Sequence, residues 1–267
     1  MKREIFHYNI GELLPYIDWS YFVHTWGMKQ SSPSTYDELI GDAKAMLSAL
    51  DGRYRTHALF ALCNARSEDD NIVAEGITIP LLRQQHSIAG KANICLSDFV
   101  SPKDDRIGMF ATCVDADFGA EYSDDTYMNL LAQTLADRLA EATATVMHRT
   151  VRTQSEYWGY APDERLSIKE LNREEYQGIR PAIGYPSLPD QSIIFVIDSI
   201  LKLGDIGIGL TPNGAMYPHS SVCGLMFSHP ASHYFSVGNI SEEQFLDYCR
   251  RRGTQPENLR KFLIKNI

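Results

Sequence analysis

The chain has 267 residues, of which 44% are hydrophobic and 10% aromatic, and its formal net charge at pH 7 is −9. This length and composition predict one folded domain over residues 1–267 with a sizeable core, and the acidic charge argues against nucleic acid or an anionic membrane surface as a partner, because both repel carboxylates. The sequence shows neither a signal peptide nor a membrane-spanning apolar stretch, so we expect a cytoplasmic protein.

The five cysteines are odd in number and form no C-x-x-C pair, so the sequence predicts reduced thiols rather than a disulfide framework or a zinc site. His229 and His233 lie four positions apart, but Pro230 between them disfavours the helix that would aim both rings at one metal ion. We therefore predict no metal site.

The first part of the chain mixes helical and strand patterns. Residues 10–22 are rich in aromatic and apolar side chains at mixed helical spacing, which indicates packed structure. Residues 35–50 begin with an S/T-x-x-E capping pattern at Thr35 and Glu38 and carry an apolar stripe, so they are predicted to form an amphipathic helix. Between residues 57 and 113, short apolar runs alternate with polar turns, as is typical of strands.

The strongest helical pattern covers residues 126–149, with apolar side chains three or four positions apart after the candidate N-caps Asp124 and Asp125. It is long enough to brace a sheet. Two further capping patterns, which start at Ser241 and Thr254, predict short helices near the C-terminus.

Between these helices the pattern is less decisive. Residues 192–201 are compatible with either a helix or a strand, whereas residues 207–218 and 222–227 have strand-like runs with Gly and Pro turns. Strands and helices do not alternate regularly, so the predicted fold class is α+β.

Motifs of several common enzyme classes are absent. The glycines of residues 204–209 reverse the order of a dinucleotide-binding fingerprint and are not followed by a helical pattern. The sequence also has no Walker A motif, no G-x-S-x-G motif and no H-E-x-x-H motif. It therefore gives no support for a nucleotide phosphate cradle, a serine hydrolase or a zinc protease.

The most informative block is RPAIGYP, residues 180–186. Two prolines restrict the backbone on either side of Gly184, so the block predicts a pre-ordered loop flanked by a guanidinium and a phenol. Such a loop could hold a carboxylate with Arg180. Composition alone favours a rigid surface turn with a solvated arginine.

This block resembles the R-x-x-x-G-Y-P signature of the activation domain of cobalamin-dependent methionine synthase. Further segments resemble that family in order along most of the chain: YIDW (16–19), DAKAML (42–47), LRQQ (82–85), CLSDFVSPK (95–103), LADRLAEA (135–142), WGYAPDE (158–164), GAMYP (214–218), SSVCG (220–224) and SHPASHYFSVG (228–238).

The resemblance implies an α+β fold in which helices brace a twisted antiparallel sheet, and S-adenosylmethionine as an extended ligand. It implies that Asp18 meets the cationic amino end of the ligand and that Arg180 meets its carboxylate. The cofactor-binding residues expected by this resemblance are Asp18, Arg180, Ala182, Gly184, Tyr185, Tyr234 and Phe235, with the last two forming an aromatic wall. From the residues alone, Asp18 is also compatible with a helix cap and Tyr234 with a core aromatic.

Asp137 and Glu141 lie four positions apart on the long predicted helix, away from its apolar stripe. The residues alone indicate a solvated face. The resemblance places Asp137 and Glu174 near the cobalamin side of the domain, where they are the candidate catalytic residues.

The sequence departs from the family pattern at four positions near the expected ligand and cobalamin surfaces: Leu188, Gln191, Pro212 and Phe235. These changes put ligand affinity and the cobalamin contact in doubt.

No D-x-H-x-x-G cobalamin-ligand motif is present; His86 has Gln84 in place of the aspartate. We therefore expect the cobalamin to be carried by a separate methionine synthase chain. A flavodoxin-like or other electron donor is expected to reduce cob(II)alamin before this chain's S-adenosylmethionine remethylates it.

Two alternatives remain open. The chain could be a cobalamin-protein chaperone or sensor that binds without methyl transfer, or a self-contained methyltransferase, for which the sequence offers no identifiable catalytic base.

Overall fold

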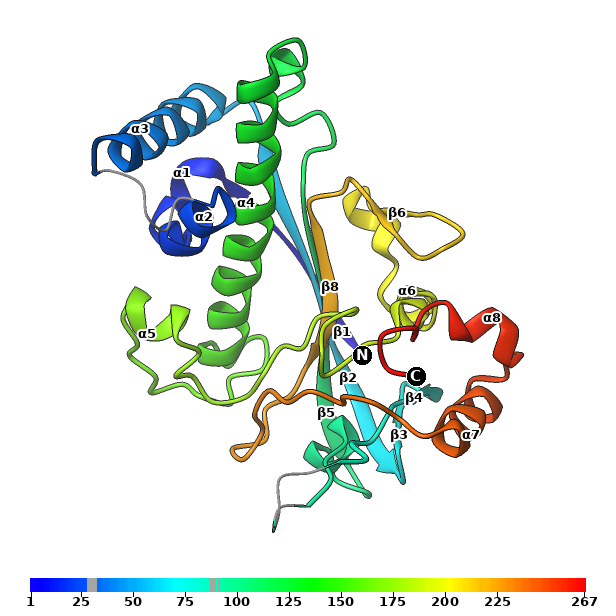
Figure 1. The fold of residues 1–267 in the computed structure, drawn as a ribbon. Helices are drawn as coiled ribbons and strands as arrows, with labels where there is room; N and C mark the ends of the chain where they lie inside the picture. The colour runs from blue at the N-terminus through cyan, green and yellow to red at the C-terminus, as the bar shows by residue number, and fades with distance from the viewer. Residues whose placement is uncertain (28–32, 87–89, 91) are drawn as a thin grey trace.

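The computed structural model describes residues 1–27, 33–86, 90 and 92–267 and has an antiparallel sheet at its centre. The strands follow the order β4-β3-β2-β5-β8, and β1 also pairs with β2 (Figure 1). These strands are β1 (Lys2–Asn9), β2 (Arg55–Glu68), β3 (Asn71–Ala74), β4 (Ile77–Pro80), β5 (Asp105–Val114) and β8 (Ser221–Met226). A separate two-stranded hairpin consists of β6 (Gly209–Leu210) and β7 (Met216–Tyr217).

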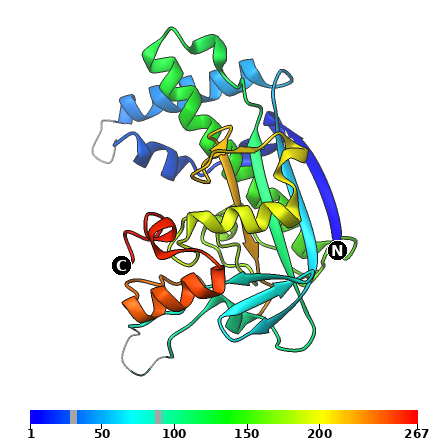
Figure 2. The same cartoon turned by 90° about the vertical axis from the view of Figure 1, so that its right-hand side faces the viewer.

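Helices cover both faces of the sheet. Helices α1 to α4 lie on one side, and α6 lies on the other side with α7 and α8 (Figures 1 and 2). The α-helices are α1 (Ile10–Leu13), α2 (Trp19–Thr25), α3 (Pro33–Leu50), α4 (Thr126–Thr153), α5 (Ile168–Asn172), α6 (Ile194–Leu201), α7 (Glu242–Arg252) and α8 (Pro256–Arg260). Short 3-10 helices are η1 (Leu14–Tyr16), η2 (Leu96–Phe99), η3 (Ala120–Tyr122), η4 (Gln191–Ile193) and η5 (Leu203–Ile206). The predicted α+β class is confirmed.

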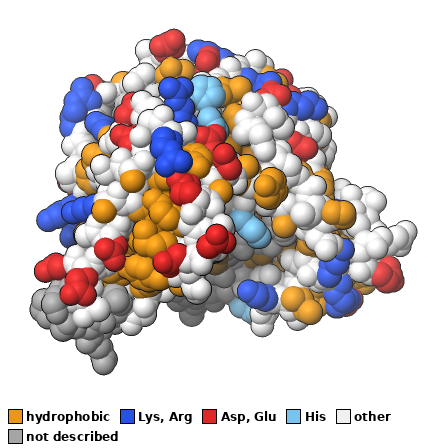
Figure 3. All heavy atoms as spheres, turned by 90° about the horizontal axis from the view of Figure 1, so that it is seen from above, with side chains coloured by type: hydrophobic (Ala, Val, Ile, Leu, Met, Phe, Trp, Pro, Cys, Tyr) orange, Lys and Arg blue, Asp and Glu red, His pale blue; other side chains and the backbone are white. Residues whose placement is uncertain are grey.

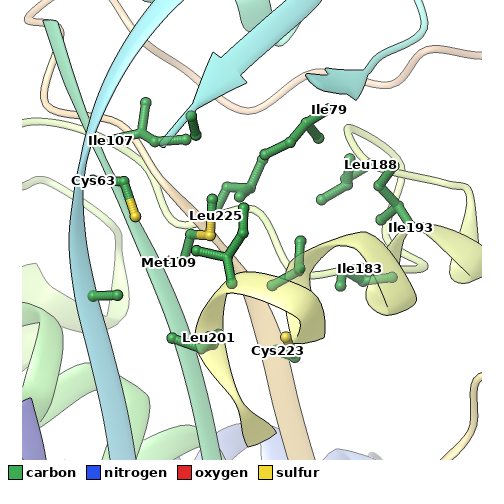
Figure 4. Packing of buried hydrophobic residues seen from close by; sticks show 14 of the residues in the cluster. Cys63, Ile79, Ile107, Met109, Ile183, Leu188, Ile193, Leu201, Cys223 and Leu225 are labelled. Atoms are coloured by element: carbon green, nitrogen blue, oxygen red, sulfur yellow. The ribbon is translucent and has the colours of Figure 1, made fainter. Parts of the chain in front are cut away.

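The central strand β2 is buried on both faces because alternate side chains enter two different cores. One set packs with α4, and it includes Ala58, Phe60 and Leu62 with Met147 and Val151. The other set packs with α6 and its neighbours, and it includes Leu59, Ala61 and Cys63 with Ile197 and Leu201. Figure 4 shows this second core, in which Cys63, Met109, Cys223 and Leu225 face the helix. All five cysteines are buried and unpaired.

The helix ends that capping chemistry predicts are largely present. Asp125 accepts a hydrogen bond from the backbone N–H of Met128 (2.9 Å) and begins α4. Ser241 caps α7, and Gly253 ends it in the left-handed conformation. The sequence pattern of residues 192–201 is compatible with a helix or a strand, and in the structure these residues form the end of η4 followed by α6.

Three boundaries differ from the prediction. Strand β1 was not anticipated, because its side chains are mostly exposed or half-buried and its sequence therefore has no strong apolar signal. Helix α3 begins at Pro33, so Thr35 lies within it instead of capping it. Helix α8 begins at Pro256 with Gln255 as its N-cap, one residue later than Thr254 would give, because proline is favoured in the first turn.

Within the described ranges, none of the helices combines the length and the apolar character needed to cross a bilayer. The face shown in Figure 3 carries a band of hydrophobic side chains with acidic and basic groups interspersed around it. This face is therefore mixed in charge.

The outer edge of β8 is covered by the segment that runs into the RPAIGYP block. Ile179 and Phe227 exchange backbone hydrogen bonds of 3.0 and 2.9 Å, and Ala182 pairs with Gly224. A Cβ atom at Gly224 would lie 2.3 Å from the carbonyl oxygen of Pro181. The close approach of the two backbones thus requires glycine at this position.

We predict that Gly224→Ala destabilises the protein by about 1 to 3 kcal/mol, because overpacking must push residues 179–183 away from β8. Gly41→Ala is the matched control: Gly41 lies in α3 with no atom within 4 Å of an added Cβ, so alanine should be neutral or stabilising there. Urea denaturation of both variants checks the difference. Equal stability of the two variants would contradict the tight docking.

Candidate functional site

The RPAIGYP block contains a tight turn at Gly184. Its φ angle is 84°, and an added Cβ would lie 2.7 Å from Oε1 of Gln191. The N–H of Gly184 donates to the carbonyl of Leu188 (2.8 Å), and the N–H of Leu188 donates to that of Tyr185 (2.9 Å). The turn therefore presents the half-exposed ring of Tyr185 from a fixed backbone.

Three adjoining depressions in front of this turn form what we call the trough. Their volumes are about 400, 260 and 190 Å³. Glu141 and Tyr185 line all three, and Arg180 and Glu174 line the first two. The first also includes Phe110, Pro181, Ala182, Pro186, Ser187, Val222, Tyr234 and Phe235, and the second includes Tyr16, Asp18, Tyr21, Arg138, Thr145, Leu171 and Asn172. The trough is extended, with charged groups where its parts meet.

Arg180 provides a positive charge that lines the two larger depressions of the trough. Its guanidinium donates to Oγ1 of Thr145 (3.0 Å) and to the hydroxyl of Tyr176 (3.1 Å), and it lies 3.5 Å from Nδ1 of His148. All three partners are uncharged acceptors, and no carboxylate of the described residues forms an ion pair with this guanidinium. A guanidinium remains protonated in proteins, so Arg180 offers a cation without an ion-pair partner to an anionic group.

His148 stays neutral beside this cation. It is fully buried, and its pKa is lowered well below 6.5 by burial and by the charges of Arg152 and Arg180. With Nδ1 facing Arg180 as an acceptor, the proton resides on Nε2, which lies 2.9 Å from the hydroxyl of Tyr160. The neutral imidazole of His148 therefore adds no positive charge next to Arg180.

Carboxylates flank the cation on the open side of the trough. Burial raises the pKa of Glu174, Arg180 opposes the rise, and the neighbouring Glu141 adds to it. Asp18 lines the second depression and also caps α2, since its carboxylate accepts a hydrogen bond from the N–H of Tyr21 (3.0 Å). The trough therefore has several negative groups along its length and two positive ones, Arg180 and Arg138.

Tyr234 and Phe235 form one wall of the first depression. The hydroxyl of Tyr234 accepts a hydrogen bond from the N–H of Arg180 (3.0 Å), and burial raises the pKa of this phenol. Buried Ser187 holds the backbone of Phe235 through two hydrogen bonds, one in each direction. The aromatic wall is thus attached to the RPAIGYP loop at two points.

The backbone N–H of Ala182 takes no part in the pairing with β8. The hydrogen bonds to β8 come from its neighbours: Ile183 N–H donates to Cys223 (2.9 Å), and Pro181 accepts from Leu225 (3.1 Å). In such an antiparallel register the N–H of Ala182 points away from the strand. Ala182 also lines the trough, so this donor is available to a bound molecule.

The structure brings most of the predicted site residues together. Seven of them line one or both of the two larger depressions: Asp18, Arg180, Ala182, Tyr185, Tyr234, Phe235 and Glu174. Gly184 does not line them but shapes the turn behind them. Asp137 lies farther along, in the third depression, where it accepts a hydrogen bond from Ser220 (2.7 Å).

Three residues of α4 in or next to the trough were not predicted as site residues. Glu141 was read from the sequence as part of a solvated face, yet it borders all three depressions. Thr145 and His148 follow it at helical spacing on α4 and reach the Arg180 guanidinium. The spacing of polar residues along one face of the long helix was the available signal.

The four residues that depart from the family pattern lie in different surroundings. Leu188 is buried in the core beside α6. Gln191 supports the turn, since its side-chain amide donates to the carbonyl of Gly214 (2.9 Å) and its oxygen lies under Gly184. Phe235 keeps an aromatic ring in the trough. Pro212 lies between β6 and β7.

Across the described part of the chain, no three His, Cys, Asp or Glu side chains are grouped so that they could hold a metal ion. The fold and the trough together define an α+β protein with an extended depression that is lined by aromatic rings and by groups of both charges.

The comparisons identify the family. Residues 9–253 match the family model described as vitamin B12 dependent methionine synthase, activation domain. A solved structure, the MetH reactivation domain bound to AdoHcy, superimposes with a TM-score of 0.93 at 36% sequence identity, covering 100% of this chain and 90% of that one. The chain belongs to the methionine synthase activation domain family, and the resemblance inferred from its motifs is confirmed.

We predict that His148 makes the stability of the fold depend on pH. Because its pKa in the folded state is lowered, the unfolded chain binds the extra proton as pH falls below 6.5, and the free energy of unfolding drops by up to ~1.4 kcal/mol per pH unit. His148→Gln should lack this component, whereas the contributions of the other histidines remain. Urea denaturation at about pH 7.5 and about pH 5.5 compares the two proteins. Parallel losses in both would show that His148 does not titrate as expected.

Proposed function

We propose that this protein binds S-adenosylmethionine in the trough and presents its methyl group to cobalamin held by a partner methionine synthase chain. The result would be reductive remethylation of cob(II)alamin, which returns the partner to its active methylated form. The observation that carries this proposal is the Arg180 guanidinium, which forms no ion pair with a described residue and lies at the junction of depressions that also contain carboxylates. The AdoHcy named for the similar MetH structure is the product of methyl transfer from S-adenosylmethionine and supports the same ligand class.

The charges of the trough complement this ligand. S-adenosylmethionine carries a carboxylate, an ammonium group and a sulfonium. Arg180 can bind the carboxylate with two parallel hydrogen bonds, while Asp18 can meet the ammonium group. Glu141 and Glu174, which line two depressions together, supply negative charge for the sulfonium.

The remaining groups suit the nucleoside. The ring faces of Tyr234 and Phe235 offer a stacking surface. The N–H of Ala182 can donate a hydrogen bond to an acceptor atom of the adenine or the ribose. The hydrogen bond from the backbone N–H of Arg180 to the Tyr234 hydroxyl keeps this wall in place before the ligand arrives. Such preorganisation reduces the entropic cost of ordering the site when the ligand binds.

The role of this chain's own residues is to bind and orient. S-adenosylmethionine would supply an electrophilic methyl group to reduced cobalamin on the partner, with the electron coming from a flavodoxin-like or similar donor. No proton transfer is needed at the methyl group, so Arg180, Asp18 and the loop backbone act by positioning and by electrostatics. Asp137 and Glu174 are the proposed groups on the side that faces the corrin.

We predict that Asp18→Asn and Arg180→Lys each weaken S-adenosylmethionine binding by about 1 to 3 kcal/mol in calorimetric titrations. Asparagine caps a helix as well as aspartate does, so the first change removes the charge and keeps the start of α2. Lysine keeps the charge of Arg180 but loses the bidentate geometry. Unchanged affinity in both folded variants would show that the ligand lies elsewhere.

Activity is predicted only in a mixture of this protein, a cobalamin-binding methionine synthase chain, S-adenosylmethionine and a reductant. The visible spectrum of the partner should shift from the cob(II) form to methylcobalamin, and omitting this chain should abolish the change. If ligand binds but remethylation proceeds equally well without the chain, the non-catalytic binding module is the better description. Methylation of a small molecule without cobalamin would favour a self-contained methyltransferase.

A further inference from the structure

A second buried arginine lies behind the trough. Arg152, on α4, is fully buried, and its guanidinium forms an ion pair with Glu164 through hydrogen bonds of 2.5 to 3.1 Å. Neither residue lines the depressions described above. A buried ion pair costs desolvation free energy, so its presence beside a ligand site calls for a physical role.

The link between this ion pair and the trough is Tyr176. The guanidinium carbon of Arg152 lies 4.5 Å from the centroid of the Tyr176 ring, and that of Arg180 lies 5.7 Å from the same centroid. The Tyr176 hydroxyl accepts a hydrogen bond from Arg180 (3.1 Å), and its ring contacts His148 edge to face at 4.9 Å between centroids. One buried ring therefore contacts both arginines and the neutral histidine.

The charges explain why the ion pair is needed. Two cations on one aromatic ring repel each other, particularly in a buried environment of low polarity. Glu164 neutralises Arg152, and His148 is uncharged. The cluster then carries one net positive charge, which belongs to Arg180 and is exposed to the trough.

We propose that Tyr176, supported by the Arg152–Glu164 ion pair, is a positioning residue that orients the Arg180 guanidinium toward the carboxylate of the ligand. The inference rests on the proposed function, because it assumes a ligand with a carboxylate. Tyr176 fixes Arg180 through the hydroxyl and the ring face together, while Thr145 holds the second terminal nitrogen of the guanidinium. Tyr176 and Thr145 thus set the orientation of the guanidinium, and Arg180 itself lines the two larger depressions.

The test uses Tyr176→Phe, which keeps the ring and removes the hydroxyl. The two probes are S-adenosylhomocysteine and decarboxylated S-adenosylhomocysteine, which lacks only the carboxylate. We expect the affinity for the first to fall by about three- to tenfold, the effect of losing one hydrogen bond, and the affinity for the second to stay the same. Tyr54→Phe is the control, since it removes a phenol that hydrogen-bonds Glu121 outside the trough, and it should change neither affinity.

The outcomes are distinguishable. An equal loss for both probes would mean that Tyr176 supports the fold of the site in general and would overturn the positioning role. Unchanged affinity for both probes would overturn it as well. If the wild-type protein binds neither probe, the proposed function itself fails. Glu164→Gln, with its fold verified by circular dichroism, provides a second test: it should also weaken only the carboxylate-bearing probe.

Discussion

The arrangement of the site depends on one constraint, which is that the guanidinium of Arg180 is held by uncharged partners and keeps its charge available. Thr145 and His148 reach it from α4, and Tyr176 reaches it from the segment just before the loop. The pairing of residues 179–183 with β8 then fixes the loop that carries it. The sheet, the long helix and the loop therefore serve one geometry: a cation presented at the meeting point of depressions that also contain carboxylates.

This arrangement connects the core with the chemistry. Alternate residues of β2 enter cores on both faces of the sheet, so α4 is seated firmly on one face and α6 on the other. The polar face of α4 then places Glu141 and Thr145 along the trough and the buried His148 next to Arg180, at intervals of three or four residues. A rigid helix is a more accurate support for a site than a mobile loop. The tight turn at Gly184 and the contact between Ser187 and Phe235 limit the freedom of the loop on the opposite side.

Part of this could be predicted from the sequence. The long helix and the cap at Ser241 follow from local periodicity and capping chemistry, and the motif RPAIGYP identified the loop and its arginine. Strand β1 could not be found in this way, because an edge strand with little apolar alternation is specified by its partner β2. Contacts that join distant segments, such as Arg152 with Glu164 and Tyr176 with Arg180, depend on tertiary packing. Asp18 caps α2 and also lines the trough, so its capping role is compatible with the ligand contact that remains a prediction.

The most direct test of the central claim is a crystal structure of the protein with S-adenosylhomocysteine. The claim predicts that the ligand carboxylate accepts hydrogen bonds from the Arg180 guanidinium, with the sulfur in the part of the trough that Glu141 and Glu174 line. The nucleoside should lie against Tyr234 and Phe235. A ligand bound outside the trough, or one bound within it with its carboxylate directed into solvent and Arg180 unchanged, would contradict the claim.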